Sequence, residues 1–265
     1  MLVVLAASLV LMLGTGCTKL KARDQLNKGV QAFKNNKFEQ AIDHFQQAVT
    51  LDPSLVNARL YLATAYAQGY VGGVDTPENI RMAEQAIDQY KQVLQADPKN
   101  INSVKGIAYL YLQQKNFPLA KEFYKKASEL DPNDPEPYYS IAVIDWTQTY
   151  QPRMEERQKL GMKPEESLAA KDKKLCAKIR DGNTANIQEG IDNLTKAIQL
   201  RPDYDDAMAY LNLMYRERAD VQCDDPSARA ADLKTADEWV DKTMATKKAK
   251  AEKTPAGGIV MDENK

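Results

Sequence analysis

Histidine is almost absent from this chain, which holds one copy, His44, among 265 residues. A catalytic or metal-binding role for His44 would need a nucleophile or further ligands around it, and the spacing of the sequence reveals none. The three cysteines form no paired Cys-x-x-Cys motif, and neither a serine elbow nor a nucleotide-binding glycine motif is present. We therefore expect no catalytic site, no metal site and no cofactor.

An excess of positive charge is also missing, because 36 Lys and Arg residues are matched by 37 Asp and Glu residues. Nucleic-acid-binding domains ordinarily carry a clear basic surplus, so we expect no nucleic-acid partner. Strand signals are equally scarce, since no alternating runs of Val, Ile and Thr stand between tight-turn pairs. The composition therefore predicts an all-α protein.

What the chain does have is a repeat. Residues 101–134 carry small and aromatic residues at fixed positions and close with a proline: Ile107, Ala108, Tyr111, Ala120, Tyr124, Ala127 and Pro132. The same skeleton returns in four further segments: 22–55, 56–100, 135–204 and 205–246. A 34-residue period with residues of these kinds resembles the tetratricopeptide repeat (TPR). The resemblance implies a right-handed α-solenoid of about five helical hairpins over residues 22–246.

The repeated residues have physical roles in that architecture. Small residues such as Gly29 and Ala120 let the two helices of a hairpin approach closely, and Tyr124 fills the space between neighbouring hairpins. Asp-Pro pairs such as Asp131-Pro132 end one repeat, because the residue before a proline leaves the helical region. A single hairpin cannot bury its apolar face, so the hairpins must stack.

Repeats two and five are interrupted by insertions. In repeat two, Gly72-Gly73 predicts a turn, and Thr76 followed by Pro77 predicts a helix start after a widened hairpin loop. Repeat five is broken between residues 218 and 226, after which a helical pattern resumes. Residues 247–265 have too little apolar content to pack, so we expect a disordered tail there.

Repeat four carries the largest insertion, residues 147–186, which is rich in charged residues. Two helices are expected inside it, at 155–160 and 165–180, and Asp181-Gly182-Asn183 predicts the end of the second. We therefore expect the insertion to form a lobe of its own beside the repeat.

The N-terminus differs from the rest. Its apolar run is too short to cross a membrane and has the length of a signal-peptide core, so residues 1–16 are predicted to be a signal peptide. Small residues at 14–16 before Cys17 resemble the bacterial lipobox, although its usual Leu is displaced by one position. The resemblance implies a lipid on Cys17, a tether at 17–21 and, because Thr18 is not Asp, a periplasm-facing place on the outer membrane. The alternative is an ordinary secreted protein in which Cys17 is free.

Cys176 and Cys223 lie in the insertions of repeats four and five, outside the repeat skeleton. The loops of successive hairpins emerge at the same edge of a solenoid, and an exported protein meets an oxidising compartment. We therefore predict a Cys176–Cys223 disulfide. The alternative is a pair of buried, reduced cysteines.

In the TPR family the first helix of each hairpin lines a concave groove, and the resemblance implies partner contacts at fourteen positions. These predicted groove residues are mainly apolar or aromatic: Leu26, Val30, Phe33, Leu60, Thr64, Asn102, Lys105, Tyr109, Leu112, Tyr139, Val143, Trp146, Leu213 and Arg216. Such a surface suits an extended peptide or a partner helix. The clamp with which chaperone-binding TPR proteins hold a carboxylate is missing at the matching positions.

The resemblance implies a lipid-anchored envelope scaffold that binds protein or peptide partners, similar to lipoproteins that assist outer-membrane protein insertion or pilus assembly. Two alternatives remain. One is a solenoid that binds a glycan or another small molecule on its aromatic side chains, and the other is a regulatory subunit of an envelope enzyme. A TPR motif specifies architecture far better than it specifies a partner, so the sequence does not identify the partner.

Overall fold

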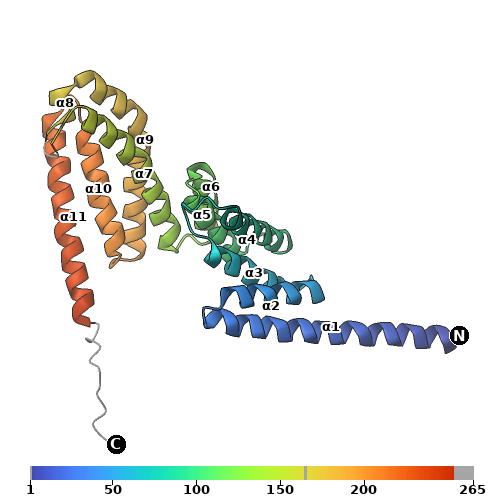
Figure 1. Ribbon diagram of the computed structural model, residues 1–265. Helices are drawn as coiled ribbons and strands as arrows, with labels where there is room; N and C mark the ends of the chain where they lie inside the picture. The colour runs from blue at the N-terminus through green and yellow to red at the C-terminus, as the bar shows by residue number, and fades with distance from the viewer. Residues whose placement is uncertain (1, 164–165, 254–265) are drawn as a thin grey trace, which may run out of the picture. The chain divides into compact units, whose positions relative to one another are not determined.

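The computed structural model (Figure 1) describes residues 2–163 and 166–253, with side chains described from Cys17 onward. This part of the chain contains eleven α-helices and no strand, which confirms the predicted all-α class. The chain divides into two compact units, Met1–Asp131 (unit 1) and Pro132–Lys265 (unit 2). Each unit is built from antiparallel helical hairpins.

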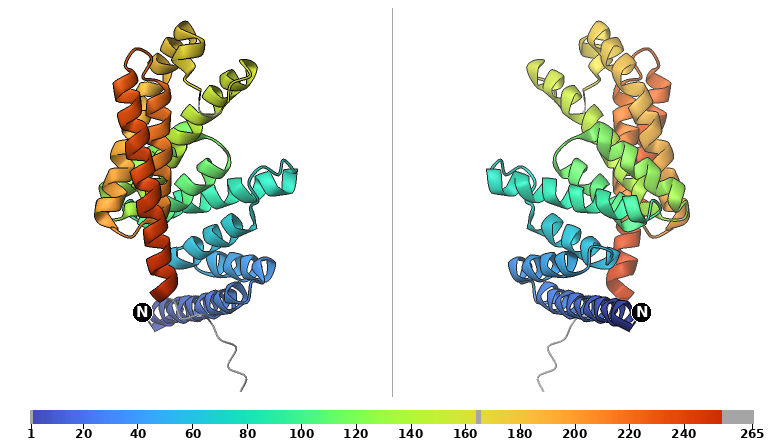
Figure 2. Two further views of the ribbon diagram at one scale, coloured as in Figure 1. Left: turned by 90° about the vertical axis from the view of Figure 1, so that its left-hand side faces the viewer. Right: turned by 90° about the vertical axis from the view of Figure 1, so that its right-hand side faces the viewer.

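Unit 1 consists of three hairpins. They pair α1 (Leu2–Lys34) with α2 (Phe38–Leu51), α3 (Val56–Gly69) with α4 (Pro77–Ala96), and α5 (Ile101–Gln113) with α6 (Phe117–Leu130). Helix α2 also packs on α3, and α4 packs on α5, so successive hairpins lie side by side (Figure 2). Phe45, Tyr90 and Ile107 are buried between them. This is the stacking that lets each hairpin bury its apolar face.

Unit 2 consists of two longer hairpins. They pair α7 (Pro135–Lys159) with α9 (Lys173–Leu200) and α10 (Asp205–Asp220) with α11 (Pro226–Lys253), and the short α8 (Leu168–Lys171) packs on α9. Helix α10 contacts both α9 and α7. Leu194, Leu211 and Met214 are at most 1% exposed and form the centre of this core.

The residue before each repeat-closing proline ends a helix. Asp52, Asp97, Asp131 and Arg201 have φ between −143° and −132° and ψ of 89° to 90°. This conformation lies outside the helical region, as the steric demand of the following proline requires. The next helix therefore starts in a new direction, and the repeat is set by local backbone chemistry.

Gly29 shows why small residues recur between paired helices. A Cβ atom at Gly29 would lie 2.5 Å from two atoms of the Phe45 ring, closer than carbon atoms approach one another. Phe45 is fully buried in α2, opposite α1. The glycine therefore permits the close approach of the two helices in the first hairpin.

The insertion in repeat two has the predicted form. Helix α3 ends at Gly69, and α4 begins at Pro77 with Thr76 as its N-cap, whose side chain accepts a hydrogen bond from the backbone N–H of Asn79 at 3.3 Å. Asn79 in turn holds the loop, because its amide bonds the backbone of Val71 and Val74 at 2.7–2.8 Å. The inserted residues thus form a fixed loop.

The predicted separate lobe in repeat four is wrong. Helix α7 runs on to Lys159 and α9 starts at Lys173, so residues 147–186 mainly lengthen the two repeat helices. The predicted helix end at Gly182 lies in the interior of α9. A glycine inside a helix costs only about 0.5–1 kcal/mol. Here buried Cys176 and Ile187, on either side of Gly182, hold both halves of α9 against the rest of unit 2.

Both predicted terminal segments also need correction. Residues 17–21 belong to α1, so the predicted tether is helical, and residues 247–253 belong to α11, where a disordered tail was predicted. Lys250 forms an ion pair with Asp205, which joins this end of α11 to α10. The rest of the predicted tail, 254–265, and the side chains of the predicted signal peptide lie outside the described residues. Among the helices of the described part, none is long and apolar enough to cross a membrane.

Candidate functional site

The fourteen predicted groove residues all lie on the first helix of a hairpin, namely α1, α3, α5, α7 or α10. None is fully buried. Asn102 and Tyr109 are exposed, and the other twelve are half-buried. The set therefore divides between side chains that face solvent and side chains that also support the core.

In unit 1, the predicted residues differ in how much they contribute to packing. Leu26, Val30, Phe33 and Leu60 pack against the core of this unit while remaining partly exposed. Tyr109, on α5, is instead 49% exposed. It is therefore the most exposed apolar side chain among the predicted groove residues of unit 1.

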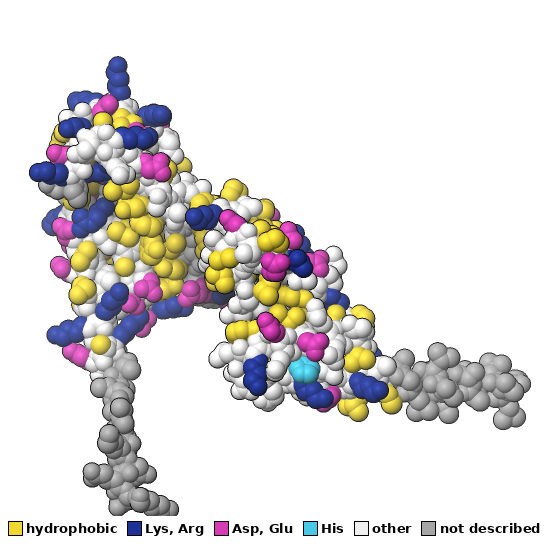
Figure 3. All heavy atoms as spheres, in the orientation of Figure 1, with side chains coloured by type: hydrophobic (Ala, Val, Ile, Leu, Met, Phe, Trp, Pro, Cys, Tyr) yellow, Lys and Arg dark blue, Asp and Glu magenta, His cyan; other side chains and the backbone are white. Residues whose placement is uncertain are grey.

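In unit 2, five aromatic side chains form a continuous row, which we call the aromatic row: Tyr204, Tyr139, Tyr210, Trp146 and Tyr150. Successive ring centroids lie 5.0, 5.6, 5.4 and 4.6 Å apart. Two contacts are edge-to-face, at 81° and 83°, and the last is stacked, at 22°. Such geometries are favourable for aromatic pairs. Figure 3 shows hydrophobic side chains gathered on the surface of unit 2 over α7 and α10.

Helical spacing explains how α7 presents its part of the row. Tyr139, Val143, Trp146 and Tyr150 follow one another at intervals of four, three and four residues, which places them on one face of the helix. Tyr150, Tyr204 and Tyr210 were not among the predicted groove residues. The spacing of Tyr150, one turn after Trp146, is a signal that would have found it.

The phenols of Tyr139, Tyr204 and Tyr210 remain protonated at neutral pH, because their pKa values are raised. Burial raises the pKa of Tyr139, and nearby Tyr210 and acidic side chains raise it further. Burial also raises the pKa of Tyr204, whose hydroxyl donates a hydrogen bond to Glu136 at 3.0 Å. The row is therefore an uncharged aromatic surface with polar edges, suited to apolar side chains or to planar groups.

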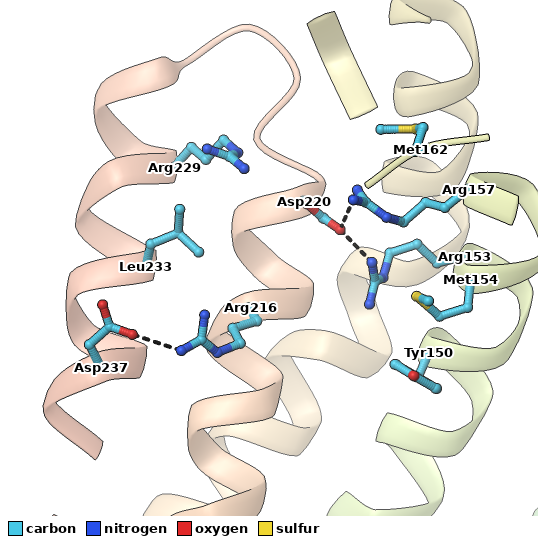
Figure 4. A pocket seen from close by; sticks show the side chains of 10 residues that line it. All are labelled: Tyr150, Arg153, Met154, Arg157, Met162, Arg216, Asp220, Arg229, Leu233 and Asp237. Carbon is cyan, nitrogen blue, oxygen red and sulfur yellow. Dashed lines mark hydrogen bonds and ion pairs between the residues drawn. The ribbon is translucent and has the colours of Figure 1, made fainter. Parts of the chain in front are cut away.

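A pocket of about 560 Å³ opens beside the end of this row, and we call it the arginine pocket (Figure 4). Side chains from α7, α10 and α11, together with Met162, line it: Tyr150, Arg153, Met154, Arg157, Met162, Arg216, Asp220, Arg229, Leu233 and Asp237. Its volume is within the range of small-ligand sites. Of these residues only Arg216 was predicted, because the others lie in the insertions or on α11.

The base of the arginine pocket is held by buried ion pairs. Arg153 donates two hydrogen bonds to Glu217, at 2.7 and 2.6 Å, and also pairs with Asp220. Arg157 reaches Asp220 at 3.2 Å and donates to the backbone carbonyls of Lys163 and Glu166 at 2.6 and 3.1 Å. These contacts fix two guanidinium groups in place and join the extension of α7 to α10.

The Sγ atoms of Cys176 and Cys223 are bonded in the structure, with Cα atoms 5.8 Å apart. Both residues are buried, and they form a small cluster with fully buried Leu168 of α8. The bond ties α9 to the connection between α10 and α11, close to the arginine pocket. Cys17 is free and exposed.

His44 has no catalytic surroundings among the described residues. Its Nδ1 atom lies 2.8 Å from the side-chain oxygen of Gln25, on the neighbouring helix α1. The described residues also hold no group of three or more His, Cys, Asp or Glu side chains placed to bind a metal ion. Tyr109, the aromatic row and the arginine pocket are the features that we consider further as partner-binding surfaces.

Comparison with known proteins gives matches to sequence families and to folds. Two family profiles described as tetratricopeptide repeat match residues 22–55 and 81–143. A search of curated proteins finds no significant match. A crystal structure of the MamA protein is similar over 89% of this chain and 97% of its own, with a TM-score of 0.58 and 14% identity.

Two further structures show the same likeness. A MamA structure from Desulfovibrio magneticus RS-1 covers 86% of this chain and 96% of its own, with a TM-score of 0.57 and 16% identity. YrrB, described as a TPR protein with an unusual peptide-binding site, covers 86% of this chain and 90% of its own, with a TM-score of 0.52 and 15% identity. At such identities the likeness shows the fold.

Proposed function

We propose that the chain is a scaffold that binds a protein partner through the first helices of its hairpins, and its matches to tetratricopeptide-repeat profiles and to the fold of repeat proteins support this. The observation that carries the proposal is the aromatic row of unit 2. Partly exposed tyrosine and tryptophan side chains are the residues that most often dominate protein interfaces. Exposed Tyr109 offers a second anchor in unit 1.

The partner is first identified by cross-linking in intact cells. The test then measures how tightly single variants of the protein bind that partner. Trp146→Ala and Tyr109→Ala should each weaken binding by about 2 kcal/mol, the usual effect of truncating an aromatic anchor. Helical content, measured by circular dichroism, should stay nearly constant. Met244→Ala is the matched control, because Met244 is a large apolar side chain, 64% exposed, on the second helix of its hairpin.

The outcomes separate binding from packing. Loss of helix content in step with loss of binding would mean that the aromatic residues support the core only. Full binding by both aromatic variants would place the interface on another surface.

The place of the scaffold in the cell is part of the proposal. The apolar N-terminal run and the small residues before Cys17 support export and lipid attachment to that cysteine, with the protein held on the periplasmic side of the outer membrane. A role in envelope or pilus assembly would follow from that location. Cys17→Ser should release the protein into the soluble fraction, since acyl chains supply about 0.8 kcal/mol per buried CH₂. Identical fractionation of both proteins, with no acyl chain on Cys17 by mass spectrometry, would reject the anchor.

A second candidate function is the binding of a glycan or another small molecule. The stacked pair Trp146 and Tyr150 favours it, because stacked aromatic faces also bind sugar rings and planar ligands. A thermal-shift screen that finds a ligand, with no partner recovered by cross-linking, would favour this function over the scaffold. A regulatory subunit of an envelope enzyme would instead be recovered with that enzyme, and we propose no catalytic role for the chain itself.

A further inference from the structure

We propose that the arginine pocket receives a carboxylate from an acidic peptide segment of the partner, whose neighbouring apolar side chains lie along the aromatic row. This inference rests on the proposed function and specifies the chemistry of the partner. The pocket depends on the insertion in repeat four and on α11, so it does not coincide with the carboxylate clamp that is missing from the predicted groove.

The charge balance of the arginine pocket favours an anion. Its lining holds four guanidinium groups and two carboxylates, and Glu217 beneath the lining adds a third carboxylate. Among the described residues, four positive charges therefore stand against three negative ones. A partly buried site with unbalanced charge attracts a ligand of the opposite sign.

Arg216 is the group placed to contact that ligand. Its Nη2 atom pairs with Asp237 at 2.7 Å, and its Nε atom donates to Asn212 at 3.2 Å. Within the described part of the chain, its Nη1 atom makes no hydrogen bond or ion pair. The side chain is 42% exposed, so this nitrogen can donate a hydrogen bond to a carboxylate oxygen of the ligand while the other two nitrogens keep the guanidinium in position.

Arg153 and Arg157 serve the site differently. Both are almost fully buried, and their donors are occupied by Glu217, Asp220 and backbone carbonyls. They are positioning residues, which fix the α7 side of the pocket and contribute positive charge. A ligand can bind beside them without displacing any of their partners.

The remaining lining favours a peptide over a small hydrated anion. Met154, Met162 and Leu233 contribute apolar surface to the pocket, and Met154 is 37% exposed. An inorganic anion would gain nothing from these side chains, whereas the CH₂ groups beside a peptide carboxylate would be buried against them.

Tyr150 connects the pocket to the aromatic row. Its ring stacks on Trp146 at 4.6 Å, and it also lines the arginine pocket, with the Arg153 guanidinium 5.5 Å from its centroid. Figure 4 shows Tyr150 and Arg153 on the same stretch of α7. One extended peptide can therefore occupy both surfaces, with apolar side chains on the row and its acidic group in the pocket.

The experiment uses the full, disulfide-bonded chain and a displayed library of random peptides. Retained peptides should carry Asp, Glu or a free C-terminal carboxylate next to apolar or aromatic residues. For one such synthetic peptide, replacing the acid by its amide should weaken binding about tenfold, and Arg216→Ala should weaken it by a similar factor. The two changes together should cost little more than either alone, because they remove the same contact.

Two further variants make the measurement specific. Arg216→Lys keeps the charge but loses the planar fork, so it should retain only part of the affinity. Arg180→Ala is the matched control, because Arg180 lies in the same unit, is 39% exposed and pairs with Asp224 at 3.3 Å, yet lines neither the pocket nor the aromatic row. It should bind the peptide as the wild type does.

The outcomes distinguish the inference from the proposed function. Retention of peptides that lack an acid, with binding weakened by Trp146→Ala but not by Arg216→Ala, would overturn the inference and leave the scaffold intact. Retention of no peptide would count against the scaffold itself. Binding of inorganic phosphate or acetate alone, dependent on Arg216 while peptides are insensitive to it, would make this a small-anion site and overturn the peptide as occupant.

Discussion

Arg153 of α7 and Glu217 of α10 face each other through two hydrogen bonds, Nε to Oε2 at 2.7 Å and Nη2 to Oε1 at 2.6 Å. Their side chains are only 8% and 2% exposed. Burial raises the pKa of the Glu217 carboxyl, while the Arg153 guanidinium opposes that rise. A buried pair of this kind contributes little net stability, but breaking it leaves an uncompensated charge in the interior. The pair therefore fixes where the extension of α7 packs against α10.

We predict that Arg153→Ala lowers the free energy of unfolding by about 3–5 kcal/mol, because Glu217 would remain buried without its partner. Urea unfolding monitored by circular dichroism provides the measurement. The double variant Arg153→Met/Glu217→Leu should recover most of the loss, since it removes both charges.

The exposed pair formed by Arg201 and Glu136 is the control for that prediction. Both of its side chains are 40% exposed, so Arg201→Ala should cost no more than about 1 kcal/mol. Equal losses for Arg153→Ala and Arg201→Ala would show that burial does not set the cost of breaking these pairs.

The repeat could be predicted from the sequence because its determinants are local. Asp131 ends α6 since Pro132 follows it, and Thr76 with Pro77 starts α4, as their order along the chain indicates. The end of a helix at Gly182 was predicted wrongly by the same local reasoning. There the packing of α9 on the rest of unit 2 outweighs the preference of one glycine.

The candidate site could be predicted only where it follows the repeat. Tyr139 and Trp146 occupy repeat positions, so the register placed them on one face of α7. The arginine pocket depends on α7 continuing past its repeat length, and on Arg153 meeting Glu217, which lies 64 residues later in the chain. No periodic signal links two such residues, and their meeting follows from the tertiary structure alone.

Gly29 and Gly182 should respond in opposite ways to the same substitution. Gly29→Ala would place a methyl group 2.5 Å from the buried Phe45 ring, so it should destabilise the protein by about 1–3 kcal/mol. Gly182→Ala adds a methyl group with no described atom within 4 Å in a helix interior, so it should stabilise by about 0.5–1 kcal/mol. Chemical denaturation of both variants measures the difference. A Gly29→Ala protein as stable as the wild type would remove the close-approach role of this glycine.

The disulfide should make a large contribution to the stability of unit 2. Cys176 and Cys223 are 47 residues apart in sequence, and the chain-entropy model gives about 4 kcal/mol for a closed loop of that length. Cys176→Ser/Cys223→Ser should therefore unfold at a markedly lower urea concentration, and reductant should shift the wild type but not the variant. Reactive thiols at Cys176 and Cys223 in protein isolated without reductant would contradict the bond.

The raised pKa of Tyr204 predicts how the free energy of unfolding changes with pH in the alkaline range. Burial raises the pKa of its phenol, and so does the hydrogen bond to Glu136. A group whose pKa is raised by folding contributes stability that is complete below its unfolded pKa, about 10 for tyrosine, and is lost as the pH rises toward the folded pKa.

We therefore expect the free energy of unfolding to fall above about pH 10, by at most about 1.4 kcal/mol per pH unit for Tyr204. Urea unfolding at several values between about pH 8 and 11 measures this slope, in a Cys17→Ser background that removes the free thiol and so prevents disulfide exchange. Tyr204→Phe should be less stable at pH 8, because its hydrogen bond is lost, but should show a shallower decline above about pH 10. If the two proteins decline in parallel, Tyr204 does not control the alkaline limit, and its burial at the end of the aromatic row does not hold its proton.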